Sequence, residues 1–262
     1  MVRRPLGNHH DGPDTFLVTS DARQTERAAT EGETLRELSS RARVILWDFD
    51  GPICSLFARH SATTVADELI GWLGAQGLHD LLTEDERASL DPHFVLRAVD
   101  RRHPGSDLVA ELEERLTTHE LKAVPTAMPT GYADVLIRTW STLGPRMAIT
   151  TNNSPSVVRK YLAGRDLLDH FAPHIYGRTK DLHLLKPDPH CLNRALRGLG
   201  SSPKDALMIG DTPSDFHAAE QAGVPFLGYA RNPRKEKLLR EAGAVDVVGS
   251  LEPVLTAVRT RP

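Results

Sequence analysis

Cysteine is scarce in this sequence: Cys54 and Cys191 are the two present among 262 residues. They are too few and too far apart to build a disulfide framework or a cysteine-based zinc site. Long apolar runs are missing as well, and none approaches the 18 or more residues that a membrane-spanning helix needs. These absences exclude a disulfide-rich scaffold and a membrane span, and they make a reducing cytoplasm the expected location.

An excess of positive charge is also missing. Lys and Arg total 32 against 35 Asp and Glu, which gives a formal net charge of -3. Without an overall positive field, neither a nucleic acid nor an anionic membrane is an expected partner. Any anion that the protein binds must therefore be held by a local group of side chains.

Residues 1–40 are poorer in apolar residues than the rest of the chain, and their charged residues, Gly and Pro follow no period. We predict a flexible N-terminal extension here. The Met-Val-Arg-Arg start is not followed by an apolar segment, and acidic residues such as Asp11 and Asp14 are untypical of a transit peptide. Export is therefore not expected.

Short apolar runs alternate with helical segments from residue 44 onward. The runs, which we predict to be buried strands, cover residues 44–49, 147–150, 206–209, 224–227 and 246–248. Segments with helical periodicity lie at about residues 130–143, 154–163, 189–199, 213–222, 233–242 and 251–258. This alternation predicts an α/β fold, with a doubly wound, Rossmann-like parallel sheet that carries helices on both faces.

One interval, between about residues 55 and 125, breaks the alternation. It contains the expected helices 63–73, 94–101 and 107–121 and no convincing strand. We therefore predict that residues 56–124 form a helical subdomain inserted after the first strand. Residues 41–55 and 125–262 would then form the core.

Polar side chains follow the predicted strands at the points where these end. They are Asp48 and Asp50 after the first run, Thr151 and Asn152 after the second, Lys186 in a loop, and Asp211 and Asp215 after the third. In a parallel sheet such residues converge on one edge. Carboxylates that share an edge need a cation, and oxygen ligands without Cys or His favour Mg²⁺. A metal, a lysine and a hydroxyl together suit a phosphoryl group.

Four segments, in this order, resemble the motifs of the haloacid dehalogenase-like hydrolase superfamily. They are Asp48-Phe49-Asp50-Gly51, Thr151-Asn152, Lys186-Pro187-Asp188-Pro189 and Gly210-Asp211 through Asp215. The helical insert resembles the cap that the phosphoglycolate phosphatase and β-phosphoglucomutase branch carries between the first two motifs. The resemblance covers about residues 44–250.

The resemblance implies a role for each matching residue. Asp48 would be the nucleophile that forms an aspartyl-phosphate, and Asp50 would be the general acid and then the base. Thr151 and Lys186 would bind the phosphoryl group, with Gly51 and Asn152 beside them. The implied Mg²⁺ ligands are Asp48, the backbone carbonyl of Asp50, Asp211 and Asp215.

These roles predict a Mg²⁺-dependent phosphatase that acts on a small phosphorylated metabolite. Asp50 favours a phosphatase over a dehalogenase, because an alkoxide leaving group needs a proton and a halide does not. A phosphomutase of the same superfamily, or a non-catalytic protein that binds a phosphorylated ligand, is the alternative.

Four positions need a separate comment. Asp215 follows Thr212-Pro213 and is also a suitable third residue of a helix cap. Arg101 and Arg102 are predicted substrate contacts in the insert, but basic residues at a helix end are often solvated. Pro52 stands where the family usually has Thr or Val, and we expect it to affect the motion of the cap.

Overall fold

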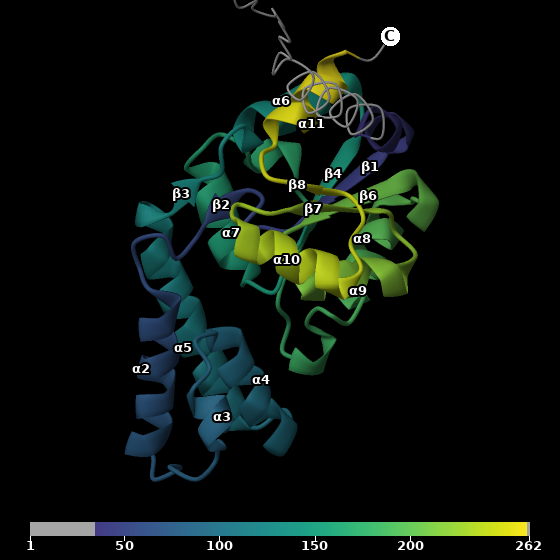
Figure 1. Cartoon of the computed structure of the whole chain (residues 1–262). Coiled ribbons are helices and arrows are strands. Elements are labelled where there is room, and N and C mark those ends of the chain that lie inside the picture. Colours follow the sequence, from purple (N-terminus) through teal and green to yellow (C-terminus); the bar gives the residue numbers. More distant parts are fainter. Residues whose placement is uncertain (1–34, 261–262) are drawn as a thin grey trace, which may run out of the picture.

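The computed structural model describes residues 35–260 of the chain (Figure 1). The extension predicted over residues 1–40 therefore lies largely outside the described residues. Residues 35–41 are helical, and Leu35 packs into the main hydrophobic core. Residues 35–40 therefore do not belong to a flexible extension, because the apolar side chain of Leu35 is buried.

Six parallel strands form the central sheet, in the order β5-β4-β1-β6-β7-β8. Their bounds are β1 (Val44–Trp47), β4 (Arg146–Thr150), β5 (Ile175–Tyr176), β6 (Ala206–Gly210), β7 (Phe226–Tyr229) and β8 (Val247–Val248). In the register of the sheet, Trp47 pairs with both Ile149 and Ile209. The carboxyl ends of β1, β4 and β6 therefore meet at one edge.

Helices cover both faces of this sheet, which confirms the predicted α/β fold. Alternate residues of the central strand point to opposite faces. Ile45 and Trp47 belong to one core cluster, whereas Val44 and Leu46 belong to another. The helices of the core are α6 (Ala133–Leu143), α7 (Pro155–Ala163), α8 (His190–Leu199), α9 (Pro213–Ala222), α10 (Pro233–Ala242) and α11 (Glu252–Arg259). The first cluster contains residues of α6, α7 and α11, and the other contains residues of α8 and α9.

The residues between the first strand and the rest of the sheet form a separate group of helices, seen below the sheet in Figure 1. These are α2 (Ala62–Ala75), α3 (Glu84–Arg87), α4 (Pro92–Arg102) and α5 (Asp107–Ala123). They bury a second cluster that includes Leu69, Leu96 and Leu112, and Leu182 and Leu185 of the core belong to the same cluster. None of the helices in residues 35–260 combines the length and the hydrophobicity that crossing a membrane requires.

Two very short strands join this insert to the core. β2 (Cys54–Ser55) and β3 (Met128–Pro129) pair in an antiparallel ribbon, so the chain leaves the core and returns to it side by side. Single 3-10 turns complete the described structure, at η1 (Val124–Thr126), η2 (Leu168–His170), η3 (Leu182–Leu184) and η4 (Pro203–Asp205). The sequence did not predict β2, β3 or β5, because two residues are too few to show a period.

Candidate active site

A cavity of about 910 Å³ lies between the carboxyl edge of the sheet and the helical insert. The predicted site residues that line it are Asp48, Asp50, Gly51, Thr151, Asn152, Lys186, Asp211 and Asp215. Segments that are far apart in the sequence therefore meet there. Parallel topology causes this convergence, because every strand of such a sheet ends at the same edge.

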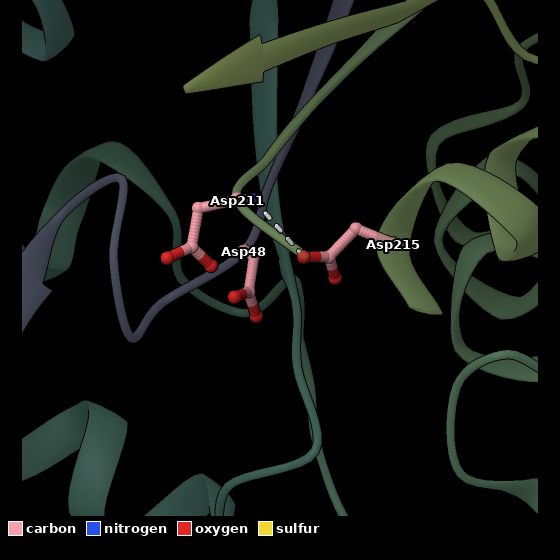
Figure 2. A group of neighbouring side chains, drawn as sticks. All are labelled: Asp48, Asp211 and Asp215. Atoms are coloured by element: carbon pink, nitrogen blue, oxygen red, sulfur yellow. Dashed lines mark hydrogen bonds between the residues drawn. The ribbon is translucent and has the colours of Figure 1, made fainter. Parts of the chain in front are cut away.

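Three buried carboxylates form the floor of the cavity (Figure 2). Asp48 follows β1, Asp211 follows β6 and Asp215 lies in the first turn of α9, and one oxygen of each lies within 4.8 Å of the others. Burial and the neighbouring charge of Asp215 raise the pKa of Asp48 to about 6, although Lys186 opposes this. Burial, with the charges of Asp215 and Asp48, likewise raises the pKa of Asp211 to about 8 against Lys235. Without a cation, the three carboxylates therefore resist ionising together.

Lys186 supplies positive charge to two of these carboxylates. Its Nζ donates to Asp48 Oδ1 at 2.8 Å and to the carbonyl of Thr150 at 2.9 Å, and it also pairs with Asp215. Burial lowers the pKa of Lys186, but the charges of Asp215 and Asp48 outweigh it and raise the pKa above the usual value. The ammonium group therefore stays charged beside Asp48.

Asn152 fixes the backbone of this lysine. Its side-chain oxygen accepts from the Lys186 N–H at 2.8 Å, and its Nδ2 donates to the Lys186 carbonyl at 3.2 Å. Asn152, which was predicted to lie beside the phosphoryl group, thus joins the Thr151-Asn152 motif to the motif that contains Lys186.

Asp215 caps α9, as the second interpretation of this residue predicts, and its role as a metal ligand stays a prediction. Its Oδ2 accepts from the N–H groups of Asp211 at 3.1 Å and Thr212 at 3.0 Å, and Thr212 Oγ1 accepts from the Asp215 N–H at 3.3 Å, which completes a capping box at the start of α9. Its Oδ1 pairs with Lys186. Asp215 therefore caps a helix and anchors the lysine with the same carboxylate.

The two carboxylate oxygens of Asp211 differ in their hydrogen bonding. Oδ2 pairs with Lys235, whereas the buried Oδ1 has no hydrogen-bond partner among residues 35–260. Gly51, with a φ of +125°, packs so closely that any side chain at this position would overlap the Asp211 carboxylate. A buried carboxylate oxygen without a donor, beside two more carboxylates, is a set that suits a hard divalent cation.

Asp50 lies in the turn that follows β1. The N–H of Leu56 donates to its Oδ1 at 2.8 Å, which orients the carboxyl at the cavity wall. Burial raises the pKa of Asp50, although the Leu56 N–H and nearby cations oppose this. A raised pKa favours a carboxyl group that can carry a proton. Pro52 is buried in the same turn, and its effect on the motion of the insert stays a prediction.

The hydroxyl of Thr151 is held by its neighbour Asn153. Thr151 Oγ1 donates to Asn153 Oδ1 at 3.0 Å and accepts from the Asn153 N–H at 3.2 Å. Thr151 is buried and lines the cavity. Its oxygen is thus placed on the same wall as Lys186.

Arg101 and Arg102 do not lie at the cavity, which corrects the sequence-based prediction. They lie in the last turn of α4, where Arg101 pairs with Glu86 at 2.9 Å and Arg102 pairs with the other oxygen of Glu86 at 2.7 Å. They join α4 to α3. Arg97, one helical turn earlier, lines the cavity instead.

Four positive groups that line the cavity were not predicted from the sequence. His93 and Arg97 of α4 line the cavity, as do Arg231 and Lys235 after β7. Burial lowers the pKa of His93, but Asp91 and Glu120 outweigh this effect and raise the pKa to about 9. The spacing of four residues between His93 and Arg97, which puts them on one face of a helix, was the available signal.

A family model described as haloacid dehalogenase-like hydrolase matches residues 97–229, about half of the chain. The chain belongs to the haloacid dehalogenase-like hydrolase family. This family membership confirms the resemblance that the motifs indicated. The match includes the segments that contain Thr151, Lys186, Asp211 and Asp215.

Several known proteins are similar to this member of the family. Phosphoglycolate phosphatase from Salmonella typhimurium is 27% identical over 213 residues, which are 77% of this chain and 82% of that protein. Phosphoglycolate phosphatase from Rhodospirillum rubrum is 38% identical over 94 residues, which are 34% of this chain and 38% of that protein. The chain spans less than half the length of three curated relatives that it matches: 38%, 45% and 43%.

The fold is shared with solved structures. CbbY from Rhodobacter sphaeroides, solved in complex with phosphate, has a TM-score of 0.61 and 20% identity, over 83% of this chain and 99% of that chain. The likeness spans both the sheet and the helical insert, since it leaves out less than a fifth of the chain. It supports the α/β fold with its inserted helices.

Proposed function

We propose that this protein is a Mg²⁺-dependent phosphatase that hydrolyses a small phosphomonoester through an aspartyl-phosphate on Asp48. The observation that carries the proposal is the buried contact between Lys186 and Asp48, 2.8 Å long, at the end of the central strand. It places an ammonium group against the carboxylate that would attack. Family membership and relatives named phosphoglycolate phosphatase support the same chemistry.

The reaction is a pair of displacements at phosphorus. A carboxylate oxygen of Asp48 forms a bond to phosphorus, and the bond from phosphorus to the ester oxygen breaks as Asp50 gives that oxygen a proton. Water then attacks phosphorus and gives its proton to Asp50, which releases phosphate and restores the Asp48 carboxylate. Lys186 supplies positive charge to the phosphoryl oxygens, and the Thr151 hydroxyl turns its one proton from Asn153 Oδ1 to the phosphoryl group when the substrate binds. Dividing one difficult step into two is what the covalent intermediate achieves.

The residues present fit a magnesium ion. Asp48, Asp211 and the backbone carbonyl of Asp50 would hold it, with Asp215 beside them. Asp211 Oδ1 is buried without a donor in the described part of the chain, and all the offered ligands are hard oxygens. When bound, the metal supplies charge that neutralises the phosphoryl oxygens.

The inserted helices form the cap over this site, and their side chains face the substrate. The cavity of about 910 Å³ is large enough for a small metabolite. Relatives are named phosphoglycolate phosphatase and phosphoserine phosphatase, and each of these substrates carries a carboxylate besides the phosphate. We therefore propose a phosphorylated metabolite of the cytoplasm with a second anionic group, rather than a nucleic acid.

The proposal is tested by phosphate release from a panel of phosphomonoesters, with and without Mg²⁺. We expect Mg²⁺-dependent release, fastest for small esters with a carboxylate or a second phosphate. Phosphate transfer between sugar hydroxyls without net release would favour a phosphomutase. A protein that binds these esters and turns none of them over would contradict the enzymatic function.

Arg97 is the cap residue expected to contact the second anionic group. In the described residues its guanidinium makes one long hydrogen bond, 3.4 Å, to the Lys186 carbonyl. Arg97→Ala should raise KM for a carboxylate-bearing phosphomonoester by about 10-fold or more, the value of one charged hydrogen bond. Hydrolysis of p-nitrophenyl phosphate should change little, since it has no such group.

The matched control is the double substitution Arg101→Ala with Arg102→Ala, which removes two arginines of the same helix that pair with Glu86. Steady-state kinetics should show an unchanged KM for this variant. If the double variant raises KM and Arg97→Ala does not, the contact has been assigned to the wrong turn of α4.

A further inference from the structure

A buried ion pair joins the insert to the core outside the carboxylate cluster. Arg178 follows β5 and Glu120 lies near the end of α5, and both side chains are fully buried. Arg178 Nη1 donates to Glu120 Oε1 at 2.9 Å, and Nη2 donates to Oε2 at 3.0 Å. This two-pronged geometry is the strongest that a guanidinium and a carboxylate form.

Other N–H groups of Arg178 bind the same face of α5, and Nη1 also donates to the carbonyl of Asn152 in the core at 3.0 Å. Nε donates to Glu113 Oε1 at 2.8 Å, and Nη2 donates to Thr117 Oγ1 at 2.7 Å. On the core side, the Arg178 N–H donates to the carbonyl of Asn153 at 2.9 Å. Gly177 permits this approach, because a Cβ there would lie 2.5 Å from the same carbonyl oxygen.

Glu120 reaches past Arg178 into residues 151–154, which we call the phosphate loop. Asn153 Nδ2 donates to Glu120 Oε1 at 2.9 Å, and the N–H of Ser154 donates to Oε2 at 3.2 Å. Asn153 is the residue that holds the Thr151 hydroxyl from both sides. Glu120 of α5 thus contacts Asn153, and Asn153 contacts the Thr151 hydroxyl at the cavity.

The Glu120 carboxylate determines the orientation of the Asn153 amide. An ionised carboxylate only accepts hydrogen bonds, so the Asn153 amide must turn its NH₂ toward Glu120 and its oxygen toward Thr151. Burial raises the pKa of Glu120, but the charge of Arg178 and the hydrogen bonds from His93 and Arg178 outweigh it and hold the pKa well below its usual value. The carboxylate therefore stays ionised.

We propose that Glu120 is a positioning residue of the phosphate loop, with Arg178 as its buried countercharge. The loop then has its full set of hydrogen bonds only while α5 is docked on the core. The Thr151 hydroxyl is therefore held in place only while the insert is docked on the core. This inference rests on the proposed function in one respect, namely that the phosphate loop binds the phosphoryl group.

The test compares two isosteric substitutions on α5. Glu120→Gln and Glu113→Gln each remove one negative charge from Arg178. Glu120 forms hydrogen bonds with the phosphate loop and with His93, whereas Glu113 forms them only with Arg178 and Thr117 among the described residues. Glu120→Gln should lower kcat for p-nitrophenyl phosphate by about 10- to 100-fold, the loss that small misplacements of a reacting group cause. It should also weaken the binding of inorganic phosphate, measured by calorimetry. Glu113→Gln should keep both values within about 2-fold.

A second variant keeps the ion pair intact. Asn153→Ala removes the amide between Glu120 and Thr151, and we expect a loss of kcat like that of Glu120→Gln. The double variant should be no more than about 3-fold worse than either single one, because residues that act through one chain of contacts are not additive. Melting temperatures of all variants show whether a loss reflects unfolding, and Asn153→Ala decides the question if Glu120→Gln does not fold.

Equal losses in Glu120→Gln and Glu113→Gln, or an unchanged kcat and phosphate affinity in Asn153→Ala, would overturn the positioning role. These outcomes leave the proposed function intact if the unmodified protein hydrolyses phosphomonoesters. A protein without turnover, whose phosphate affinity still falls in Glu120→Gln alone, would overturn the proposed function and support the positioning role.

Discussion

Asp48→Asn is expected to reduce phosphate release to background, a loss of roughly 10⁴-fold or more, as when the nucleophile of other covalent mechanisms is removed. Asparagine keeps the size of the side chain, and its oxygen still accepts from Lys186, but it offers no charged oxygen to attack phosphorus. Release of phosphate from p-nitrophenyl phosphate and from the best metabolite of the panel is the measurement.

The fold should survive this substitution. Burial and Asp215 raise the pKa of Asp48 from 3.8 to about 6, so ionising this carboxyl destabilises the folded protein as pH rises through that range. The neutral amide of the variant removes that penalty, and at neutral pH without metal the melting temperature should stay the same or rise. Asp205→Asn, at the opposite end of β6, is the matched control and should keep full activity. More than a few per cent of activity in Asp48→Asn would contradict an aspartyl-phosphate.

Removal of divalent metal with EDTA is expected to abolish phosphate release, and excess Mg²⁺ to restore it. Asp48, Asp211 and Asp215 offer oxygens within 4.8 Å of one another, and without a cation they repel one another beside an anionic substrate. Zn²⁺ should restore activity poorly, because it prefers nitrogen and sulfur ligands. Phosphate release across a Mg²⁺ titration measures the effect.

Binding of the metal can also be followed without turnover. A ligand present at 100 times its Kd stabilises a protein by about 2.7 kcal/mol, so Mg²⁺ should raise the melting temperature by several degrees. Asp211→Asn should reduce that shift, since Asp211 Oδ1 is buried without a donor among residues 35–260, whereas Asp205→Asn should keep it. Full activity in EDTA would show that the carboxylates have another role.

Much of the carboxylate site could be predicted from the sequence, because its residues follow strands. Asp48 comes directly after a fully buried run, and Asp211 follows another. Once alternation of strands and helices indicates a parallel sheet, the ends of the strands must meet, and the residues there must lie close together. The juxtaposition of Asp48 and Asp211 follows from that one constraint. Lys186 lies in a loop after β5, a strand that the sequence did not predict, so its role was implied by the family resemblance.

The contacts of the insert could not be predicted in the same way. The helices themselves have a readable period, but their orientation toward the core depends on packing between side chains distant in sequence. Arg101 and Arg102 were the more conspicuous basic pair, yet they pair with Glu86, and Arg97 lines the cavity. Arg97 lies only one helical turn before Arg101, and this difference decides whether the side chain lines the cavity or pairs with Glu86.

By itself the sequence determined the α/β fold, the order of the motifs and the acidic character of the site, because periodicity and strand ends are local properties of the chain. Tertiary structure alone decided which charges are compensated. Lys186 is shared by Asp48 and Asp215, Asp211 keeps an oxygen without a donor in the described residues, and Arg178 is buried against Glu120. A charged side chain is stable in the interior only beside a partner. These partners lie far apart in the sequence, so only folding brings them together.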